Sequence, residues 1–329
     1  MREGRRVRIR YLGFGGTIAS VAVPGTTEAR PALTAAEVLA SVPQLRELAE
    51  IEPRDFATIA SYAVTVGHML ALAREAAQAF EEGCDAVVIT HGTDTIEETA
   101  YALALMLPRD HSVVLTGALR NPSLPSPDGA ANLLAACRVA ATPGTAALGP
   151  LVVLNDEVHA ARFATKTHTS RPSTFASPGA GPLGEIVEGR VDLWFRPLWE
   201  DYLGLPESLE GHSVELIRVA AGIDDGLMRA AIAKQPDGIV LEGFGGGHLP
   251  LSLLPALDDA LAEGIAVVIA TRGVAGPNLE RTYRLEGAET DLIERGALTA
   301  GALAGHKVRL RLLVGSALGL PAHSLFPVR

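Results

Sequence analysis

The stretch from Asp85 to Leu107 reads DAVVITHGTDTIEETAYALALML, and its character changes part-way along. It opens with a short apolar, β-branched run and closes with alanines and leucines near helical spacing, which predicts a buried strand followed by a helix. Between the two, His91, Thr93 and Asp94 gather around Gly92. A strand that passes through a polar turn into a helix is typical of parallel α/β sheets.

The same alternation extends along the chain and decides the fold class. We predict an α/β protein with mainly parallel sheets flanked by helices. The expected strands are VRIRYLG (7–13), DAVVIT (85–90), SVVLTG (112–117), PLVVLN (150–155), VELIRVA (214–220), DGIVLEG (237–243) and IAVVIAT (265–271). The expected helices are ALTAAEVLASV (32–42), GHMLALAREAAQAFEEG (67–83), DTIEETAYALALML (94–107), DGAANLLAACRVAA (128–141), DGLMRAAIAKQ (225–235) and LLPALDDALAEG (253–264).

The rhythm breaks between Arg196 and Ser213, in RPLWEDYLGLPESLEGHS, where prolines, glycines and acids gather. This composition is typical of a connection between domains. We therefore expect a larger amino-terminal domain over 1–195, a linker over 196–213 and a smaller carboxy-terminal α/β domain over 214–329.

Composition argues against several functional classes. The formal net charge of −10, without a basic block, makes nucleic acid a poor partner. The sequence has no apolar run long enough for a membrane span, and no apolar h-region follows the basic start, so we expect a cytoplasmic protein. Cys84 and Cys137 have neither disulfide nor zinc spacing, and we expect both to be reduced core residues.

Polar loops follow several of the expected strands, and ligands of open parallel sheets bind at the carboxyl ends of strands. GFGGTIAS (13–20) carries the Thr17 hydroxyl on a glycine-rich loop, although a simple turn would use the same glycines. In TGALRNPSLPSPDG (116–129), Asp128 is expected to cap the next helix. In LNDEVHAARFATKTHTS (154–170), Lys166 stands between two threonines, as a solvated loop lysine or as a base.

The HGTDT turn has two interpretations. Thr95 and Glu98 fit a capping box, so the helix is expected to start there. That leaves His91, Thr93 and Asp94 either to satisfy the turn or to form a site. In the second case the motif's glycine and the helix terminus would offer N–H groups to a developing oxyanion.

Together these loops predict a threonine-based nucleophilic site. A threonine hydroxyl is a weak nucleophile until a base takes its proton, and Lys166 near Thr93 would supply that base, with Asp94 to hold the amine. Thr17 would provide a second hydroxyl. The sequence contains no G-x-S-x-G, H-E-x-x-H or G-x-x-x-x-G-K-[ST] motif and no zinc cysteine pairs, which disfavours the competing chemistries.

Several segments, in this order along nearly the whole chain, resemble the bacterial-type L-asparaginases. They are GGTIAS (15–20), ITHGTDTIEETAYAL (89–103), LTGALR (115–120) with DGAANL (128–133), LNDEVHAARFATKTHTSRPSTFASPGAGPLG (154–184) and GIVLEGFGGGHLP (238–250). HGTDT and the TKT segment are the most specific of these. The resemblance implies hydrolysis of the side-chain amide of L-asparagine to aspartate and ammonia, without metal or organic cofactor.

The resemblance also implies roles for individual residues. Thr17 matches the family's nucleophile. Thr93, Lys166 and Asp94 match its second threonine–lysine–aspartate set, and Asp94 also matches the residue that holds the substrate's α-amino group. Members assemble as dimers or tetramers with sites near the subunit boundary, so a homodimer or homotetramer is expected.

The remaining substrate contacts follow from the same resemblance. Ser61 in TIASYAV matches, less securely, the position that binds the α-carboxylate. Ala118 matches the residue whose backbone carbonyl accepts from the substrate amide.

The chain also departs from the family's pattern. The tyrosine that many members carry about a dozen residues after the GGTI threonine is missing from SVAVPGTTEARPAL (20–33). Tyr62 replaces a glutamine found in several members, and its ring is expected to narrow the pocket in favour of a short amide. His248 stands where some members offer an asparagine to the neighbouring subunit; it either makes such a contact or is satisfied in its own turn. Glu286 and Glu289 are the candidates for the intersubunit glutamate.

Other readings stay open. A glutaminase would use the same machinery. The amidase subunit of a complex that acts on charged tRNA usually carries an extra amino-terminal domain, whereas GGTI begins here after fourteen residues. A binding protein that kept the pocket and lost the chemistry would account for the missing tyrosine.

Overall fold

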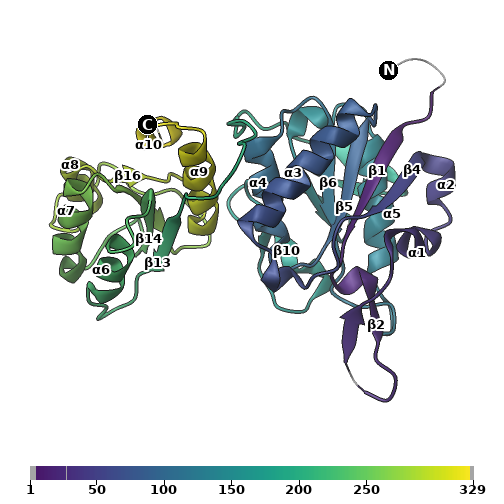
Figure 1. Ribbon diagram of the computed structural model, residues 1–329, viewed down its shortest axis with the longest axis horizontal. Helices are drawn as coiled ribbons and strands as arrows, with labels where there is room; N and C mark the ends of the chain where they lie inside the picture. Colours follow the sequence, from purple (N-terminus) through teal and green to yellow (C-terminus); the bar gives the residue numbers. More distant parts are fainter. Residues whose placement is uncertain (1–4, 27, 327–329) are drawn as a thin grey trace. The chain divides into compact units, whose positions relative to one another are not determined.

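The computed structural model describes residues 5–26 and 28–326, which form two compact units that divide between Leu205 and Pro206 (Figure 1). We call these unit 1 and unit 2. Each has its own sheet and its own hydrophobic core. The α/β fold class with mainly parallel sheets is thereby confirmed.

Unit 1 is built on an eight-stranded sheet with the order β12-β11-β8-β7-β6-β5-β1-β4. Neighbouring strands are parallel along the part β7-β6-β5-β1-β4. Strands β8, β11 and β12 form an antiparallel edge. The strands are β1 (Arg8–Phe14), β4 (Glu50–Asp55), β5 (Ala86–His91), β6 (Ser112–Thr116), β7 (Leu151–Leu154), β8 (Glu157–Ala160), β11 (Gly184–Val187) and β12 (Arg190–Leu193), with the hairpins β2 (Ser20–Ala22)–β3 (Ala29–Pro31) and β9 (Thr165–Lys166)–β10 (Phe175–Ala176).

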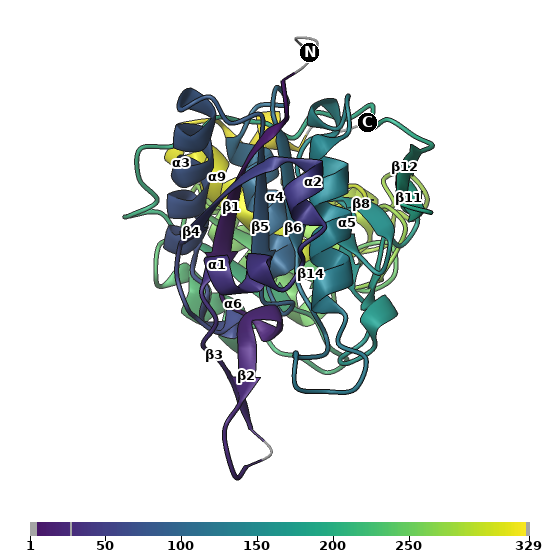
Figure 2. The ribbon, with the colours of Figure 1, turned by 90° about the vertical axis from the view of Figure 1, so that its right-hand side faces the viewer.

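Helices cover both faces of this sheet, which explains why β5 is buried along its whole length. In Figure 2, α3 lies on one side of the strands and α5 on the other. The α5 face also holds α1 and α2, which share one apolar cluster with β1 and β5. The helices of unit 1 are α1 (Ala35–Ala40), α2 (Leu45–Leu48), α3 (Val66–Glu81), α4 (Ile96–Met106) and α5 (Gly129–Ala141).

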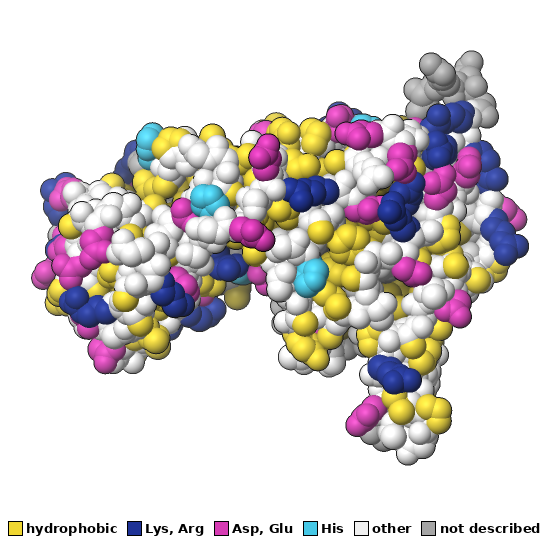
Figure 3. All heavy atoms as spheres, viewed as in Figure 1, with side chains coloured by type: hydrophobic (Ala, Val, Ile, Leu, Met, Phe, Trp, Pro, Cys, Tyr) yellow, Lys and Arg dark blue, Asp and Glu magenta, His cyan; other side chains and the backbone are white. Residues whose placement is uncertain are grey.

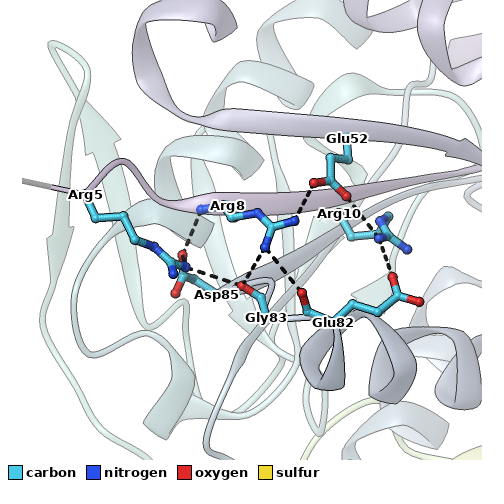
Figure 4. Close-up of polar contacts among 7 residues, drawn as sticks. All are labelled: Arg5, Arg8, Arg10, Glu52, Glu82, Gly83 and Asp85. Carbon is cyan, nitrogen blue, oxygen red and sulfur yellow. Dashed lines mark hydrogen bonds and ion pairs between the residues drawn. The ribbon is translucent and has the colours of Figure 1, made fainter. Parts of the chain in front are cut away.

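The basic start of the chain forms ion pairs across the α3 side of β1. Because side chains alternate along a strand, Arg8 and Arg10 point to the same face. Glu52 of β4 accepts from Arg8 at 2.6 Å and from Arg10 at 3.0 Å, and Glu82, at the end of α3, accepts from Arg10 at 2.7 Å (Figure 4). The hydrogen bonds from these arginines lower the pKa of Glu52. This network ties β1 to its neighbours at the end of the sheet opposite the polar loops.

Unit 2 is a smaller parallel sheet of four strands in the order β13-β14-β15-β16. Its strands are β13 (Val214–Arg218), β14 (Gly238–Gly243), β15 (Ala266–Thr271) and β16 (Leu298–Thr299). Its helices are α6 (Gly226–Ile232), α7 (Leu254–Ala262), α8 (Glu289–Arg295), α9 (Gly305–Ala317) and α10 (Ala322–Leu325).

The segment expected to be a linker is divided between the two units. Its first part, up to Leu205, groups with unit 1. The reason is that Asp201 is 2% exposed and accepts from Tyr101, while the N–H of Leu203 donates to the carbonyl of Leu105 at 2.8 Å. Residues 201–204 therefore pack on α4 in place of forming a free connection.

The described surface carries mixed charge. On the face in Figure 3, basic and acidic side chains are interspersed. Among the helices of residues 5–26 and 28–326, none is both long and apolar enough to cross a bilayer.

Candidate active site

The carboxyl ends of β1, β5 and β6 bring three polar loops to one edge of the sheet. In the parallel register Phe14 pairs with His91, and Thr90 pairs with Thr116. The loops that begin at 15, 92 and 117 therefore leave the sheet side by side. This is the edge where parallel sheets bind ligands.

A lysine joins the threonine and the aspartate of HGTDT. Lys166 Nζ donates to Thr93 Oγ1 at 2.9 Å and to Asp94 Oδ1 at 2.7 Å. The lysine reaches them from the β9–β10 hairpin, where it pairs with Phe175. Its side chain is 16% exposed and that of Asp94 is 53% exposed. The hydrogen bond from Lys166 holds the pKa of the Asp94 carboxyl below its usual range, so the aspartate is a charged acceptor for Lys166 Nζ.

Ser61 completes this cluster from the segment between β4 and α3. It begins a short 3-10 helix, Ser61–Ala63, and is 5% exposed. Its Oγ contacts Asp94 twice, donating to Oδ2 and accepting from the backbone N–H, each at 3.2 Å. Its carbonyl accepts from Thr95 Oγ1 at 2.7 Å.

Glycines let the loop backbones approach one another. A Cβ on Gly16 would lie 2.6 Å from the Cα of Gly92, and a Cβ on Gly92 would lie 2.6 Å from Ser61 Oγ. Thr17 follows Gly16 directly and starts a 3-10 helix, Thr17–Ala19. The first loop is thus packed on the HGTDT turn, and the half-buried Thr17 is held within one residue of that contact.

His91 belongs to the core of the turn. Its ring is fully buried and packs edge-on against Phe14, with centroids 4.8 Å apart. Nδ1 donates to the carbonyl of Gly92 at 2.7 Å, since a carbonyl can only accept, and Nε2 then accepts from Thr99 Oγ1 at 3.0 Å. Burial lowers the pKa of His91 to about 4, which keeps the ring neutral near pH 7. Of the two interpretations of His91, the structure favours the satisfied turn.

The prediction of a capping box at α4 is wrong. Thr95 is the N-cap residue, but its hydroxyl donates to Ser61 instead of accepting from the first turn of the helix. The hydrogen bond to Ser61 thus takes the place of the expected bond within the first turn of α4.

The prediction that Asp128 caps α5 with its side chain is also wrong. Its carboxylate turns back and accepts from the N–H groups of Leu119 and Arg120, at 3.0 Å and 2.8 Å. Asp128 therefore closes the loop that follows Ala118, which is itself fully buried.

Asn132 supports the site, although no sequence motif indicated this role. Its Nδ2 donates to the carbonyl of Gly117 at 2.9 Å, and its Oδ1 accepts from the N–H of Asn155 at 2.9 Å. It is 3% exposed within an apolar helix. A lone amide on the buried face of α5 was the signal that could have identified it.

Two further expected residues, Tyr62 and His248, are described by their own surroundings. Tyr62 is 81% exposed, so its ring closes no pocket within one chain. His248, in unit 2, bonds Glu289 Oε2 at 3.0 Å and packs edge-on against Tyr283. Glu289 also accepts from the N–H groups of Thr282 and Tyr283 and is 3% exposed. This geometry favours a histidine satisfied in its own unit.

No cluster of three or more His, Cys, Asp or Glu side chains is placed to hold a metal ion within the described part of the chain. The chemistry that the site can offer is that of hydroxyls, an amine, a carboxylate and backbone N–H groups.

Two family models match the chain in the order of its units. The asparaginase N-terminal model covers residues 8–198, and the glutaminase/asparaginase C-terminal model covers residues 213–324. The chain belongs to the asparaginase family. It is therefore an amidohydrolase of the asparaginase class, and the resemblance noted in the sequence is confirmed.

Known asparaginases are similar over nearly the whole length. A probable L-asparaginase of Deinococcus radiodurans is 39% identical over 95% of this chain and 94% of its own. The crystal structure of a probable cytoplasmic L-asparaginase from Campylobacter jejuni has a TM-score of 0.83 at 32% identity and covers 96% of each chain. A glutamyl-tRNA(Gln) amidotransferase subunit of Pyrococcus furiosus is 36% identical, but the match spans only 63% of that protein.

Proposed function

We propose that this asparaginase hydrolyses the side-chain amide of L-asparagine to L-aspartate and ammonia through an acyl-enzyme on threonine. The observation that carries the proposal is the pair of bonds from Lys166 Nζ to Thr93 Oγ1 and Asp94 Oδ1, at 2.9 and 2.7 Å. A partly buried lysine held between a hydroxyl and a carboxylate is placed to exchange protons with that hydroxyl.

In the first step Thr17 Oγ attacks the amide carbon and gives up its proton, which passes to the departing nitrogen. The C–N bond breaks, ammonia leaves and an ester remains on Thr17. Negative charge that develops on the carbonyl oxygen is stabilised by backbone N–H groups near Gly92 and Thr93. The carbonyl of Ala118 accepts from the amide N–H₂ group and so orients the leaving group.

In the second step a water molecule attacks the ester carbon. Thr93 and Lys166 take its proton, and the proton returns to Thr17 as the ester bond breaks, which releases L-aspartate. Lys166 acts in this step as the neutral amine, and Asp94 keeps its Nζ in reach of Thr93 and contacts the substrate's α-amino group. Ser61 receives the α-carboxylate.

We favour asparagine over glutamine because the relatives that are similar over nearly the whole chain are named L-asparaginases. Equal kcat/KM on L-asparagine and L-glutamine would contradict this preference. The similarity to the amidotransferase subunit makes glutaminase activity the second candidate.

We also propose a cytoplasmic homodimer or homotetramer in which a neighbouring subunit helps to complete the site. Exposed apolar side chains near the end of unit 1 support an interface: Trp194 is 50%, Phe195 60% and Leu198 100% exposed. A monomer by light scattering at assay concentration would contradict it. His248→Ala would raise KM if that histidine reached a partner's site; an unchanged KM would place it within its own unit.

The test of function is ammonia release from L-asparagine, D-asparagine, L-glutamine and a plain aliphatic amide. Wild type, Thr17→Ala and Thr93→Val are compared, with Thr142→Val as the matched control, because the Thr142 hydroxyl donates to the carbonyl of Arg138 at the end of α5. Release from L-asparagine that is lost in the first two variants and kept in the control supports the proposal. A folded wild type that binds L-aspartate but releases no ammonia would contradict it and indicate a binding protein.

A further inference from the structure

Thr95 is the last residue of HGTDT, and its hydroxyl departs from the behaviour of other N-cap threonines in this chain. Thr34 and Thr65 accept from the backbone N–H of the third residue of α1 and α3, as N-cap threonines normally do. Thr95 occupies the same position at α4, yet its Oγ1 donates to the carbonyl of Ser61 at 2.7 Å. The difference lies in the surroundings and not in the residue type.

A helix whose N-cap side chain accepts no hydrogen bond from the first turn is less stable at its start. Residues that break such a local preference are concentrated at functional sites. Here the replaced contact joins two segments that are 34 residues apart in the chain. It therefore fixes tertiary geometry at the expense of local stability.

Two consecutive residues hold Ser61 at two points. The backbone N–H of Asp94 donates to Ser61 Oγ at 3.2 Å, and the hydroxyl of Thr95 donates to Ser61 O at 2.7 Å. The N–H of Val64 also donates to Ser61 O, at 3.1 Å within the short 3-10 helix, so it is the Thr95 bond that ties this carbonyl to the HGTDT turn. Two bonds, one at each end of the residue, fix both the distance from Ser61 to Asp94 and the direction of its side chain.

We propose that Thr95 is a positioning residue that sets the spacing between Ser61 and Asp94 and thereby selects amides that carry an α-carboxylate. The inference rests on the proposed function, in which Ser61 binds that carboxylate and Asp94 binds the α-amino group. Thr95 itself touches no reacting atom. Its loss weakens the grip on one end of the substrate and leaves the chemistry at the other end intact.

The test compares Thr95→Val, which keeps the shape and removes the donor, with Thr95→Ser, which keeps the donor. L-aspartate binding is measured by calorimetry, and kcat/KM is measured for L-asparagine and for 3-aminopropanamide, the same amide without its α-carboxylate. We expect Thr95→Val to weaken L-aspartate binding and raise KM for L-asparagine about three- to tenfold, as loss of one hydrogen bond implies. Its kcat and its activity on 3-aminopropanamide stay close to wild type, and Thr95→Ser stays close to wild type throughout.

Thr34→Val is the matched control, because it removes a true cap from α1 and should lower Tm without changing L-aspartate binding. Thr95→Gly serves if Thr95→Val is too unstable to assay, since glycine is a tolerated N-cap without a side-chain donor. In a Ser61→Ala background, Thr95→Val should have no further effect on L-aspartate binding.

Unchanged L-aspartate binding in folded Thr95→Val, an equal loss on both amides, or a loss that persists in the Ser61→Ala background would overturn the inference. These outcomes differ from a failure of the proposed function. If wild type releases no ammonia but Thr95→Val still weakens L-aspartate binding, the positioning role stands and the hydrolytic proposal fails.

Discussion

The Nζ atom of Lys166 donates to two partners in this site, Thr93 and Asp94. Lys166→Met keeps the aliphatic stem and removes the proton carrier. We expect kcat for L-asparagine to fall by about 10²–10⁴-fold, the usual contribution of a positioned acid–base group. Lys234→Met is the control, since that lysine forms an exposed ion pair with Glu215 and should leave kcat unchanged. Equal kcat values in the two variants would contradict the role of Lys166.

A substitution at Gly92 tests how closely the HGTDT turn must approach Ser61. A Cβ there would lie 2.6 Å from Ser61 Oγ and 2.7 Å from Ser61 Cβ, so Gly92→Ala must displace Ser61. We expect KM for L-asparagine to rise at least about tenfold and stability to fall by about 1–3 kcal/mol, as in other overpacked sites. In Gly67→Ala the new atom would meet nothing closer than Thr65 Oγ1 at 3.6 Å, so activity should be kept. Steady-state kinetics and denaturant unfolding distinguish the two variants.

At the scale of elements, the strands that could be predicted carry short apolar, β-branched runs. β5 and β14 are buried along their whole length, whereas β13 was predicted although it is partly exposed. β8, β11 and β12 could not be predicted from the sequence. Each has only four residues of mixed polarity, and the strand across the sheet decides whether such a segment pairs.

The candidate site was likewise predicted in part. Polar residues at strand ends indicated where Thr93, Asp94 and Lys166 would lie, and the structure brings these three together. The contact between Thr95 and Ser61 was not predictable, because capping rules see only the next turn of the helix and not a carbonyl 34 residues away.

The loop after β6 depends on Asp128, and this gives a prediction for the element. Asp128→Ala leaves the N–H groups of Leu119 and Arg120 without their charged acceptor, so we expect a loss of about 1–3 kcal/mol and faster tryptic cleavage after Arg120. Asp224→Ala, which removes an exposed acceptor for Gly226, is the control. Equal cleavage rates after Arg120 in both variants would show that Asp128 does not order the loop.

Across the whole molecule, the buried His91 and His159 and the half-buried His306 make stability depend on pH. Burial lowers the pKa of His91, His159 and His306 to about 4 in the folded chain. The unfolded chain binds protons at the ordinary histidine pKa, so it holds more protons between pH 4 and about 6.5. Stability contributed by these groups is therefore complete above about pH 6.5 and is lost as pH falls toward 4.

Calorimetry in buffers of different ionisation enthalpy measures this effect. We expect an uptake of about one proton per buried histidine on unfolding near pH 5, and a Tm that falls steadily below pH 6.5. A Tm that stays flat from pH 6.5 to 4.5 would contradict the burial of these rings in neutral form.

The central claim, that a threonine on the first loop carries the acyl group, is tested most directly by trapping that group. Thr93→Val keeps Thr17 but weakens the activation of water, so the ester should accumulate when L-asparagine is added. Acid quenching, tryptic digestion and mass spectrometry should find the ester at Thr17, in the peptide of residues 11–46. An ester on any other residue, or an unmodified Thr17 in protein that still releases ammonia, would contradict the account.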